Sequence, residues 1–338
     1  MSMSLDKVSD DGGGQALPVG TRLEEYVVEG VLGVGGFGMT YLARDEHLGR
    51  QVVIKENLPV GYCYRDTGSL SVYPRSKGGE DEAGFRWSLD NFAKEGAMLA
   101  RLDHPGIVKG LRSFSAFGTR YFVMPYVEGE TLDRKIERRK ESGEGFAEDE
   151  VLGLLEWVLE ALEYLHGEGI YHRDIKPGNI LITVEGKPVL IDFGSARQRL
   201  GERSMTVVES VGYTAFEQLE SRGNVGAWTD LYALGGTVVK MIAGEALPKA
   251  MDRVKQDPYV KLGNREEMRV RYGRDVLRGI DRAVEVDERE RWQNAGEWME
   301  WMRGGGDEAD GVGVRVQLRG KLVEMVQNLG KNLSLIHI

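Results

Sequence analysis

The chain has 338 residues, which exceeds one ordinary domain and suits a unit of two lobes with tails. Its composition, 41% hydrophobic and 29% charged, is typical of a soluble globular protein, and its formal net charge of −10 argues against a nucleic-acid partner. The single cysteine, Cys63, excludes a disulfide framework within the chain and favours a reducing compartment.

The N-terminal residues 1–20 are polar and rich in glycine, and they lack the basic and apolar regions of a signal peptide. We expect them to be a disordered tail. No stretch of the sequence reaches the roughly 18 apolar residues of a membrane-spanning helix. The predicted fold therefore begins near residue 21.

The first half of the chain is predicted to be mostly β structure. Residues 26–32 and 40–43 are typical of two strands that flank a glycine-rich turn, and residues 51–55 form a third, apolar strand. The polar stretch 56–90 follows. Its composition indicates a loop or a partly ordered insertion, and connections of that length are usually functional or disordered.

A helix is predicted over residues 91–102, because its apolar residues recur at spacings of three and four. The face formed in this way contains Phe92, Glu95, Leu99 and Leu102. Glu95 is a charged group on an otherwise apolar face, so it is a candidate for a function inside the fold.

The second half is predicted to be mainly helical. A strand over residues 121–124 runs into Pro125, which ends strand pairing and predicts a linker between two lobes. Helices are then expected over residues 151–165, 230–243, 274–287 and 294–302. A strand-rich half followed by a helical half is an α+β arrangement. From residue 303 the composition changes to that of a linker.

The turn between the first two strands is rich in glycine and reads Leu32-Gly33-Val34-Gly35-Gly36-Phe37-Gly38. Glycines in such a turn let backbone N–H groups approach phosphate oxygens without a clash with Cβ atoms. A chance glycine-rich turn is the alternative, since the chain contains 46 glycines. A strand follows the turn, so this is not a dinucleotide-binding fingerprint.

Lys55 ends the third predicted strand. It could extend to solvent, or it could place a cation on the phosphates of a nucleotide, which requires a carboxylate to hold it. Glu95 is the candidate carboxylate, and it is otherwise an ordinary solvated helix residue. The two residues together, in this order, favour the phosphate function.

The segment His172-Arg173-Asp174-Ile175-Lys176-Pro177-Gly178-Asn179 is the most specific motif of the chain. Its chemistry explains its spacing. Asp174 would orient a hydroxyl proton, Lys176 would neutralise a γ-phosphate, and Asn179 would supply an oxygen to Mg²⁺. The alternative is a polar loop after a helix.

The apolar run Val189-Leu190-Ile191 delivers Asp192 to the turn Asp192-Phe193-Gly194, thirteen residues after Asn179. Hard oxygen ligands suit Mg²⁺, and Asp192 and Asn179 would provide two of them.

In this order, the motifs resemble the eukaryotic-type protein kinases, specifically the bacterial serine/threonine kinases, over roughly residues 21–302. The resemblance implies a small, mostly antiparallel β N-lobe with one key helix over residues 21–126. It implies a larger, mostly helical C-lobe over residues 127–302. ATP and Mg²⁺ (or Mn²⁺) would be the cofactors, and Ser/Thr hydroxyls of proteins would be the acceptors. Lys176 is similar to the lysine of Ser/Thr rather than Tyr kinases.

The resemblance also implies which residues bind ATP. Met124 would be the gatekeeper, and the Pro125 carbonyl and Val127 backbone would read adenine. The full implied set is Leu32, Gly33, Gly35, Gly36, Phe37, Gly38, Thr40, Lys55, Met124, Pro125 and Val127. Thr40 stands where valine is usual.

Control of activity is implied by Arg173, which would pair with a phosphate on the activation segment. Candidate phosphosites are Ser204, Thr206 and Ser210, of which Thr206 is preferred and Ser210 could instead face the substrate. Autophosphorylation there would involve self-association.

The end of this segment departs from the family, because Ala215-Phe216-Glu217 stands where Ala-Pro-Glu is usual. Glu217 is kept, and Arg291 stands where its buried partner would be.

Two other functions are alternatives to that of an active protein kinase. A pseudokinase or scaffold that binds nucleotide without transfer generally lacks the lysine or one of the two aspartates, and none is missing here. A small-molecule kinase of related fold is disfavoured by Lys176 and the full-length activation segment.

The final residues 333–338 match one reading frame of a transposon adapter used in sequencing libraries. We interpret them as an artefact of truncation, the alternative being an apolar helix end. Residues 303–338 would then be a linker and a truncated extension. We expect a cytoplasmic catalytic domain, with the full-length protein open to membrane tethering through the missing part.

Overall fold

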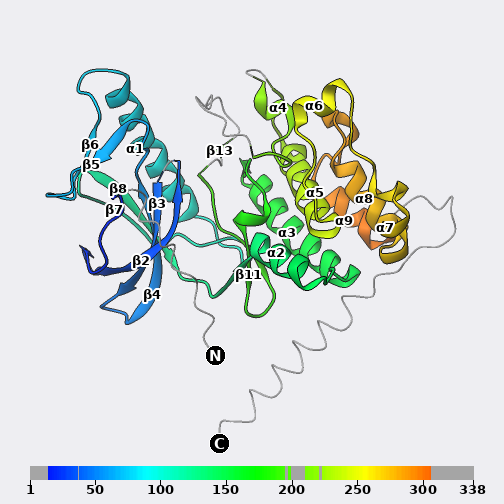
Figure 1. Cartoon of the computed structure of the whole chain (residues 1–338), viewed down its shortest axis with the longest axis horizontal. Helices are drawn as coiled ribbons and strands as arrows, with labels where there is room; N and C mark the ends of the chain where they lie inside the picture. The colour runs from blue at the N-terminus through cyan, green and yellow to red at the C-terminus, as the bar shows by residue number, and fades with distance from the viewer. Residues whose placement is uncertain (1–13, 37, 195–196, 199–209, 221–222, 306–338) are drawn as a thin grey trace, which may run out of the picture. The chain divides into compact units, whose positions relative to one another are not determined.

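The computed structural model describes residues 14–36, 38–194, 197–198, 210–220 and 223–305 (Figure 1). The chain divides into two compact units. The first comprises residues 1–143 and 167–202, and the second comprises residues 144–166 and 203–338. The division into lobes at residues 126 and 127 stays a prediction.

The first unit is built on a six-stranded antiparallel sheet, in the order β1-β2-β3-β4-β8-β7. Its strands are β1 (Arg22–Leu23), β2 (Tyr26–Gly35), β3 (Gly38–Asp45), β4 (Arg50–Asn57), β7 (Arg112–Ala116) and β8 (Thr119–Pro125). The structure confirms the four strands expected from the sequence and lengthens each of them. In the register, Lys55 pairs with Thr40 on one side and with Phe122 on the other.

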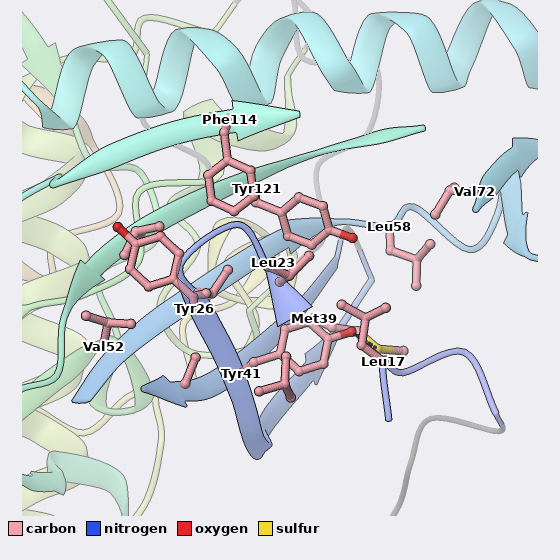
Figure 2. Packing of buried hydrophobic residues seen from close by; sticks show 14 of the residues in the cluster. Leu17, Leu23, Tyr26, Met39, Tyr41, Val52, Leu58, Val72, Phe114 and Tyr121 are labelled. Atoms are coloured by element: carbon pink, nitrogen blue, oxygen red, sulfur yellow. Dashed lines mark hydrogen bonds between the residues drawn. The ribbon is translucent and has the colours of Figure 1, made fainter. Parts of the chain in front are cut away.

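One face of the sheet carries a hydrophobic cluster, which Figure 2 shows from close by. Alternate residues of the strands contribute to it, as expected for a sheet with one buried face. The Phe114 ring stacks on Tyr26 and Tyr121, with centroid distances of 6.1 and 5.4 Å. Leu17, which precedes the first strand, is buried in the same cluster.

The segment between Lys55 and Glu95 was expected to be a loop or a partly ordered insertion over residues 56–90, and the structure shows an ordered insertion with secondary structure of its own. It contains a hairpin of β5 (Cys63–Arg65) and β6 (Val72–Pro74), followed by α1 (Glu80–Leu99). The helix begins eleven residues earlier than the sequence predicted and ends at Leu99 rather than residue 102. Acidic residues fill its first turn, where they stabilise the N-terminus of a helix.

The rest of the first unit holds short elements around two loops, residues 172–176 and 191–194. A three-stranded sheet has the order β12-β11-β9, and β10 pairs with β13. The elements are β9 (Gly129–Thr131), α2 (Leu132–Ser142), β10 (Ile170–Tyr171), η1 (Pro177–Asn179), β11 (Ile180–Thr183), β12 (Pro188–Leu190) and β13 (Arg197–Gln198).

The second unit is helical, as predicted. Its helix α5 (Ala227–Ala243) is almost entirely buried, and the C-cap residue Gly244 that follows has a φ of 73°, the left-handed conformation of a C-terminal glycine. The longer elements are α3 (Glu148–Gly167), α5 (Ala227–Ala243), α8 (Arg274–Ala283) and α9 (Ala295–Glu300). The shorter ones are α4 (Phe216–Leu219), α6 (Ala250–Lys255), η2 (Leu262–Asn264), α7 (Glu266–Arg271), η3 (Glu288–Glu290) and η4 (Trp301–Gly305). The α8 helix ends at Ala283 rather than at residue 287.

Among the described residues, no helix has the length and apolar character needed to cross a membrane.

Candidate active site

The glycine-rich turn joins β2 to β3, where Gly35 pairs with Gly38. A Cβ atom on Gly38 would lie 2.0 Å from the Glu56 carbonyl oxygen, so packing alone requires glycine there. A Cβ atom on Gly33 or Gly36 would meet nothing within 4 Å. Protein packing therefore leaves these two positions open to side chains, and their smallness suits close approach by a ligand. Phe37 lies outside the described residues.

The residues expected to contact adenine lie at the end of β8. Met124 is buried and pairs with Val53, and Pro125 is the last residue of the strand. Val127 follows in a half-buried connection. The structure thus places this set on one segment beside β4, and its role in reading adenine stays a prediction.

Lys55 forms ion pairs with two carboxylates. Its Nζ lies 3.3 Å from Glu95 Oε1 and 2.6 Å from Asp192 Oδ1. The pair with Glu95 is well covered, with side chains 17% and 12% exposed. Two residues that are forty positions apart in the sequence, on β4 and α1, therefore meet as the motif order predicted.

The charges at this point shift each other's pKa. Burial by itself lowers the pKa of Lys55, but the carboxylates of Asp192 and Glu95 more than reverse this, so the net shift is upward. Burial raises the pKa of Asp192, but the charge and hydrogen bond of Lys55 lower it to about 2. Both groups are therefore ionised at neutral pH.

Asp174 lies in the loop between β10 and η1, where three predicted side chains converge. Lys176 Nζ lies 3.1 and 2.8 Å from the two carboxylate oxygens of Asp174. Asn179 Nδ2 donates to the Asp174 carbonyl at 2.8 Å and to its Oδ2 at 2.9 Å. The Ile191 N–H donates to the Asn179 carbonyl, so this loop is tied to the segment that carries Asp192.

The loop is supported by packing to which the sequence analysis assigned no role. His172 and Phe193 are both fully buried, and their ring centroids lie 4.6 Å apart. The Asp174 N–H donates to His172 Nδ1 at 3.4 Å. Arg173, between them, has a φ of 65°, a strained backbone that is typical of functional loops. This contact could have been predicted from the sequence, because His172 and Phe193 each belong to one of the two motifs.

The donor set fits a metal that arrives with a nucleotide. Asn179 Nδ2 is used on Asp174, which leaves the amide Oδ1 for a cation. Asp192 Oδ2 adds a second hard oxygen, because the hydrogen bonds of Asp192 to Lys55 and Gly194, within the described residues, use its Oδ1. Within the described residues no cluster of three His, Cys, Asp or Glu side chains could hold a metal. Mg²⁺ is typically held by one or two protein oxygens plus phosphates.

The second unit contains the other predicted pair. Glu217 Oε1 lies 2.7 Å from Arg291 Nη1, and their side chains are 4% and 0% exposed. Ser210 donates its backbone N–H to Thr214 Oγ1 at 2.9 Å. Ser204 and Thr206 lie outside the described residues.

Comparison with known proteins gives consistent results. The protein kinase domain family matches residues 64–290. The chain is 30% identical over 292 residues to the serine/threonine-protein kinase PknA of Nostoc sp., an alignment of 81% of this chain and 46% of that protein. It is 30% identical over 298 residues to serine/threonine-protein kinase C of Synechocystis sp., covering 82% and 49% respectively. The chain thus spans about half the length of these curated relatives.

Among solved structures, "PpkA-294 apo form" superposes with a TM-score of 0.74 at 32% identity, covering 85% of this chain and 99% of that one. This likeness confirms the α+β kinase fold that the motifs predicted. The chain therefore belongs to the protein kinase domain family, among the bacterial serine/threonine kinases of eukaryotic type.

Proposed function

We propose that the chain is an active serine/threonine protein kinase that transfers the γ-phosphate of ATP to Ser/Thr hydroxyls of proteins. The observation that carries the proposal is the convergence of charged groups in the first unit. Lys55 contacts Glu95 and Asp192, and Asp174 contacts Lys176 and Asn179. The kinase family uses ATP and a divalent metal, and we propose Mg²⁺ or Mn²⁺ here.

Each group has a task that its position supports. The bound metal–ATP complex supplies the phosphoryl group and the cation that neutralises its charge. Lys55, held by Glu95, would hold the phosphates in place, and Asn179 and Asp192 would hold the metal. Asp174 would orient the acceptor hydroxyl and accept its proton, which makes the hydroxyl oxygen a stronger nucleophile.

Lys176 has a second effect through Asp174. Its ammonium lies within 3.1 Å of both carboxylate oxygens, so the direction of the Asp174 carboxylate is fixed. The same cation would offset negative charge that develops on the transferred group. Asn179 completes the arrangement, because its Nδ2 binds the side chain and the backbone of Asp174 together.

The test is Asp174→Asn, with Asp103→Asn as the matched control. Asp103 also pairs with a lysine, Lys109 at 3.0 Å, but it is 85% exposed. We expect Asp174→Asn to bind ATP as the wild type does and to lose at least about 100-fold in kcat, since it removes the proton acceptor. Asp103→Asn should keep full activity.

Two results would contradict the proposal. Undiminished phosphate incorporation by Asp174→Asn would refute the role of this residue. A wild-type protein that binds ATP but transfers no phosphate to itself or to a generic basic protein would instead be a pseudokinase.

We further propose that activity is conditional on autophosphorylation of the activation segment, with Thr206 as the preferred site and Ser204 next. Arg173, adjacent to Asp174, would be the cation that receives the phosphate. Phosphopeptide mapping after incubation with ATP tests this. An active preparation without phosphate on either residue would refute it. Phosphate found on Ser210 instead would make Ser210 the regulatory phosphosite.

A further inference from the structure

The segment between Lys55 and Glu95 forms a support for the first half of α1. A Cβ atom on Gly84 would lie 2.6 Å from the Tyr62 ring, so the helix backbone rests directly on that ring. Phe85, one residue on, is buried in the same cluster as Cys63 and Val72 of the hairpin. The first turns of α1 are therefore packed on the hairpin.

The second half of α1 packs on the sheet. A Cβ atom on Gly96 would lie 3.0 Å from the Phe122 ring of β8, which is a close approach of the helix to the strand. Glu95 is the neighbouring residue. The position of Glu95 therefore depends on contacts at both ends of the helix, with the hairpin at one end and the sheet at the other.

Strand β4 and helix α1 are joined at two matched places. Lys55 and Asn57, two residues apart on β4, project from the same face of the sheet. Ser88 and Glu95, seven residues apart on α1, lie two turns apart on one face of the helix. Lys55 binds Glu95, and Asn57 Oδ1 accepts a hydrogen bond from Ser88 Oγ at 2.5 Å.

The contact between Asn57 and Ser88 is enclosed. Both residues are buried, at 2% and 6% exposure. In the part of the chain that the structure describes, Ser88 is the one side-chain partner of the Asn57 amide, whose Nδ2 has no hydrogen bond. Loss of the serine hydroxyl would leave the buried amide oxygen without a donor, so this point of α1 is strongly specified.

Glu56 lies between Lys55 and Asn57 on β4, and its side chain projects from the opposite face of the strand. There it accepts a buried set of hydrogen bonds. Its carboxylate accepts hydrogen bonds from Tyr41 at 2.7 Å and from Tyr121 at 2.5 Å. Its third partner is Arg65 of the hairpin, at 2.5 Å, with both side chains at most 1% exposed. Figure 2 shows Tyr41 and Tyr121 among the residues of the hydrophobic cluster.

The other two nitrogens of the Arg65 guanidinium are also hydrogen-bonded. Nε donates to the Gln15 carbonyl at 2.7 Å, and Nη1 donates to the Leu70 carbonyl at 2.6 Å. A buried ion pair is tolerated only when its geometry and its hydrogen bonds are complete. The hairpin is therefore fixed in place on β4, directly behind Lys55.

We propose that this insertion is a positioning device for the catalytic Lys55–Glu95 pair, with Arg65 and Ser88 as its positioning residues. Arg65 fixes the hairpin to β4, the hairpin supports α1, and Ser88 sets the level of α1 at which Glu95 meets Lys55. This inference rests on the proposed kinase function.

The alternative partner of Lys55 explains why a loose α1 would cost activity. Lys55 Nζ already lies 2.6 Å from Asp192 and 3.3 Å from Glu95. If α1 moved away, Lys55 would lose Glu95 and could bridge both carboxylate oxygens of Asp192, including the Oδ2 that would bind the metal. Loss of positioning should therefore appear as lower kcat that excess Mg²⁺ partly restores, because the metal competes with Lys55 for Asp192.

The first test compares Ser88→Ala with Ser69→Ala, a serine of the same insertion whose hydroxyl bonds to Asp66 and to the Ser71 N–H on the exposed hairpin loop. We expect Ser88→Ala to lower kcat about ten-fold at low Mg²⁺, the scale of one hydrogen bond, and to recover part of it at high Mg²⁺. Ser69→Ala should behave as wild type at both concentrations.

The second test removes the anchor of the hairpin. Arg65→Met leaves Glu56 buried without its cation and endangers folding, so the double variant Glu56→Gln/Arg65→Met is used beside it. We expect the double variant to recover most of the Tm lost in Arg65→Met but to keep a reduced kcat. Arg75→Met, which changes an exposed arginine of the same hairpin, is the control.

Hydrogen exchange of the amides from residue 88 to residue 99 provides a readout that needs no activity. Faster exchange in Ser88→Ala and in the double variant supports the inference. Exchange and kcat equal to those of the controls overturn it. If the wild type transfers no phosphate, the proposed function fails, and the exchange rates alone decide the positioning role.

Discussion

Removal of one partner of the buried pair Glu217–Arg291 should lower the stability far more than removal of one partner of an exposed pair of the same chemistry. Arg291 is fully enclosed, and its guanidinium donates to Glu217 at 2.7 and 3.2 Å. Thr229 Oγ1 also donates to Glu217, at 2.9 Å. Glu217→Ala removes the only carboxylate that the described residues place on Arg291.

The magnitude follows from this enclosure. Removal of one partner of a buried ion pair costs about 3–5 kcal/mol, because the other charge stays buried and uncompensated. At about 2–4 °C per kcal/mol for a domain of this size, Tm should fall by about 6–20 °C. The control is Glu245→Ala in the same unit, where Glu245 lies 2.6 Å from Arg265 but is 62% exposed. An exposed pair contributes about 0–1 kcal/mol.

The assay is thermal unfolding of the variants at one protein concentration and pH. A double variant, Glu217→Leu/Arg291→Met, removes both charges and should be more stable than Glu217→Ala. Equal Tm values for Glu217→Ala and Glu245→Ala would refute the reasoning, because they would show that burial adds nothing to the pair.

Three further outcomes follow from the site. Although burial raises the pKa of Asp192, Lys55 lowers it from the ordinary 3.8 to about 2, so this pair adds stability above about pH 4 that is lost as the pH falls toward 2. Asp192→Asn should therefore flatten the dependence of Tm on pH in that window. Gly38→Ala, whose Cβ would meet the Glu56 carbonyl at 2.0 Å, should lower both Tm and ATP affinity in unfolding and calorimetric experiments. Gly33→Ala has open space, so Tm should stay unchanged while calorimetry reports weaker ATP binding.

Much of the active site could be predicted from the sequence, because its residues follow one another at fixed local spacing. Asp174, Lys176 and Asn179 occupy one loop, and the backbone of that loop brings their side chains together. Helix α5 could be predicted in the same way, since its apolar run is followed by a glycine, the residue that adopts the left-handed conformation at a helix end without a steric clash.

The secondary structure of the insertion could not be predicted from its sequence, for a physical reason. Its two strands have three residues each, too few to reveal an alternating pattern. Nothing in the sequence singles out Arg65 as a buried residue, since arginine is seldom buried without a partner, and its partner Glu56 is identifiable only when β4 and the hairpin are folded together.

The sequence by itself determined the family and predicted the chemistry of the candidate site residues, because motif spacing is a local property of the chain. Only the tertiary structure decided which partners those residues have. Lys55 lies between Glu95 and Asp192, which is 137 positions away, and Ser88 meets Asn57 across the helix and the sheet. Such contacts depend on the register of strands and the level of a helix, which are set by packing and not by the pattern of any single segment.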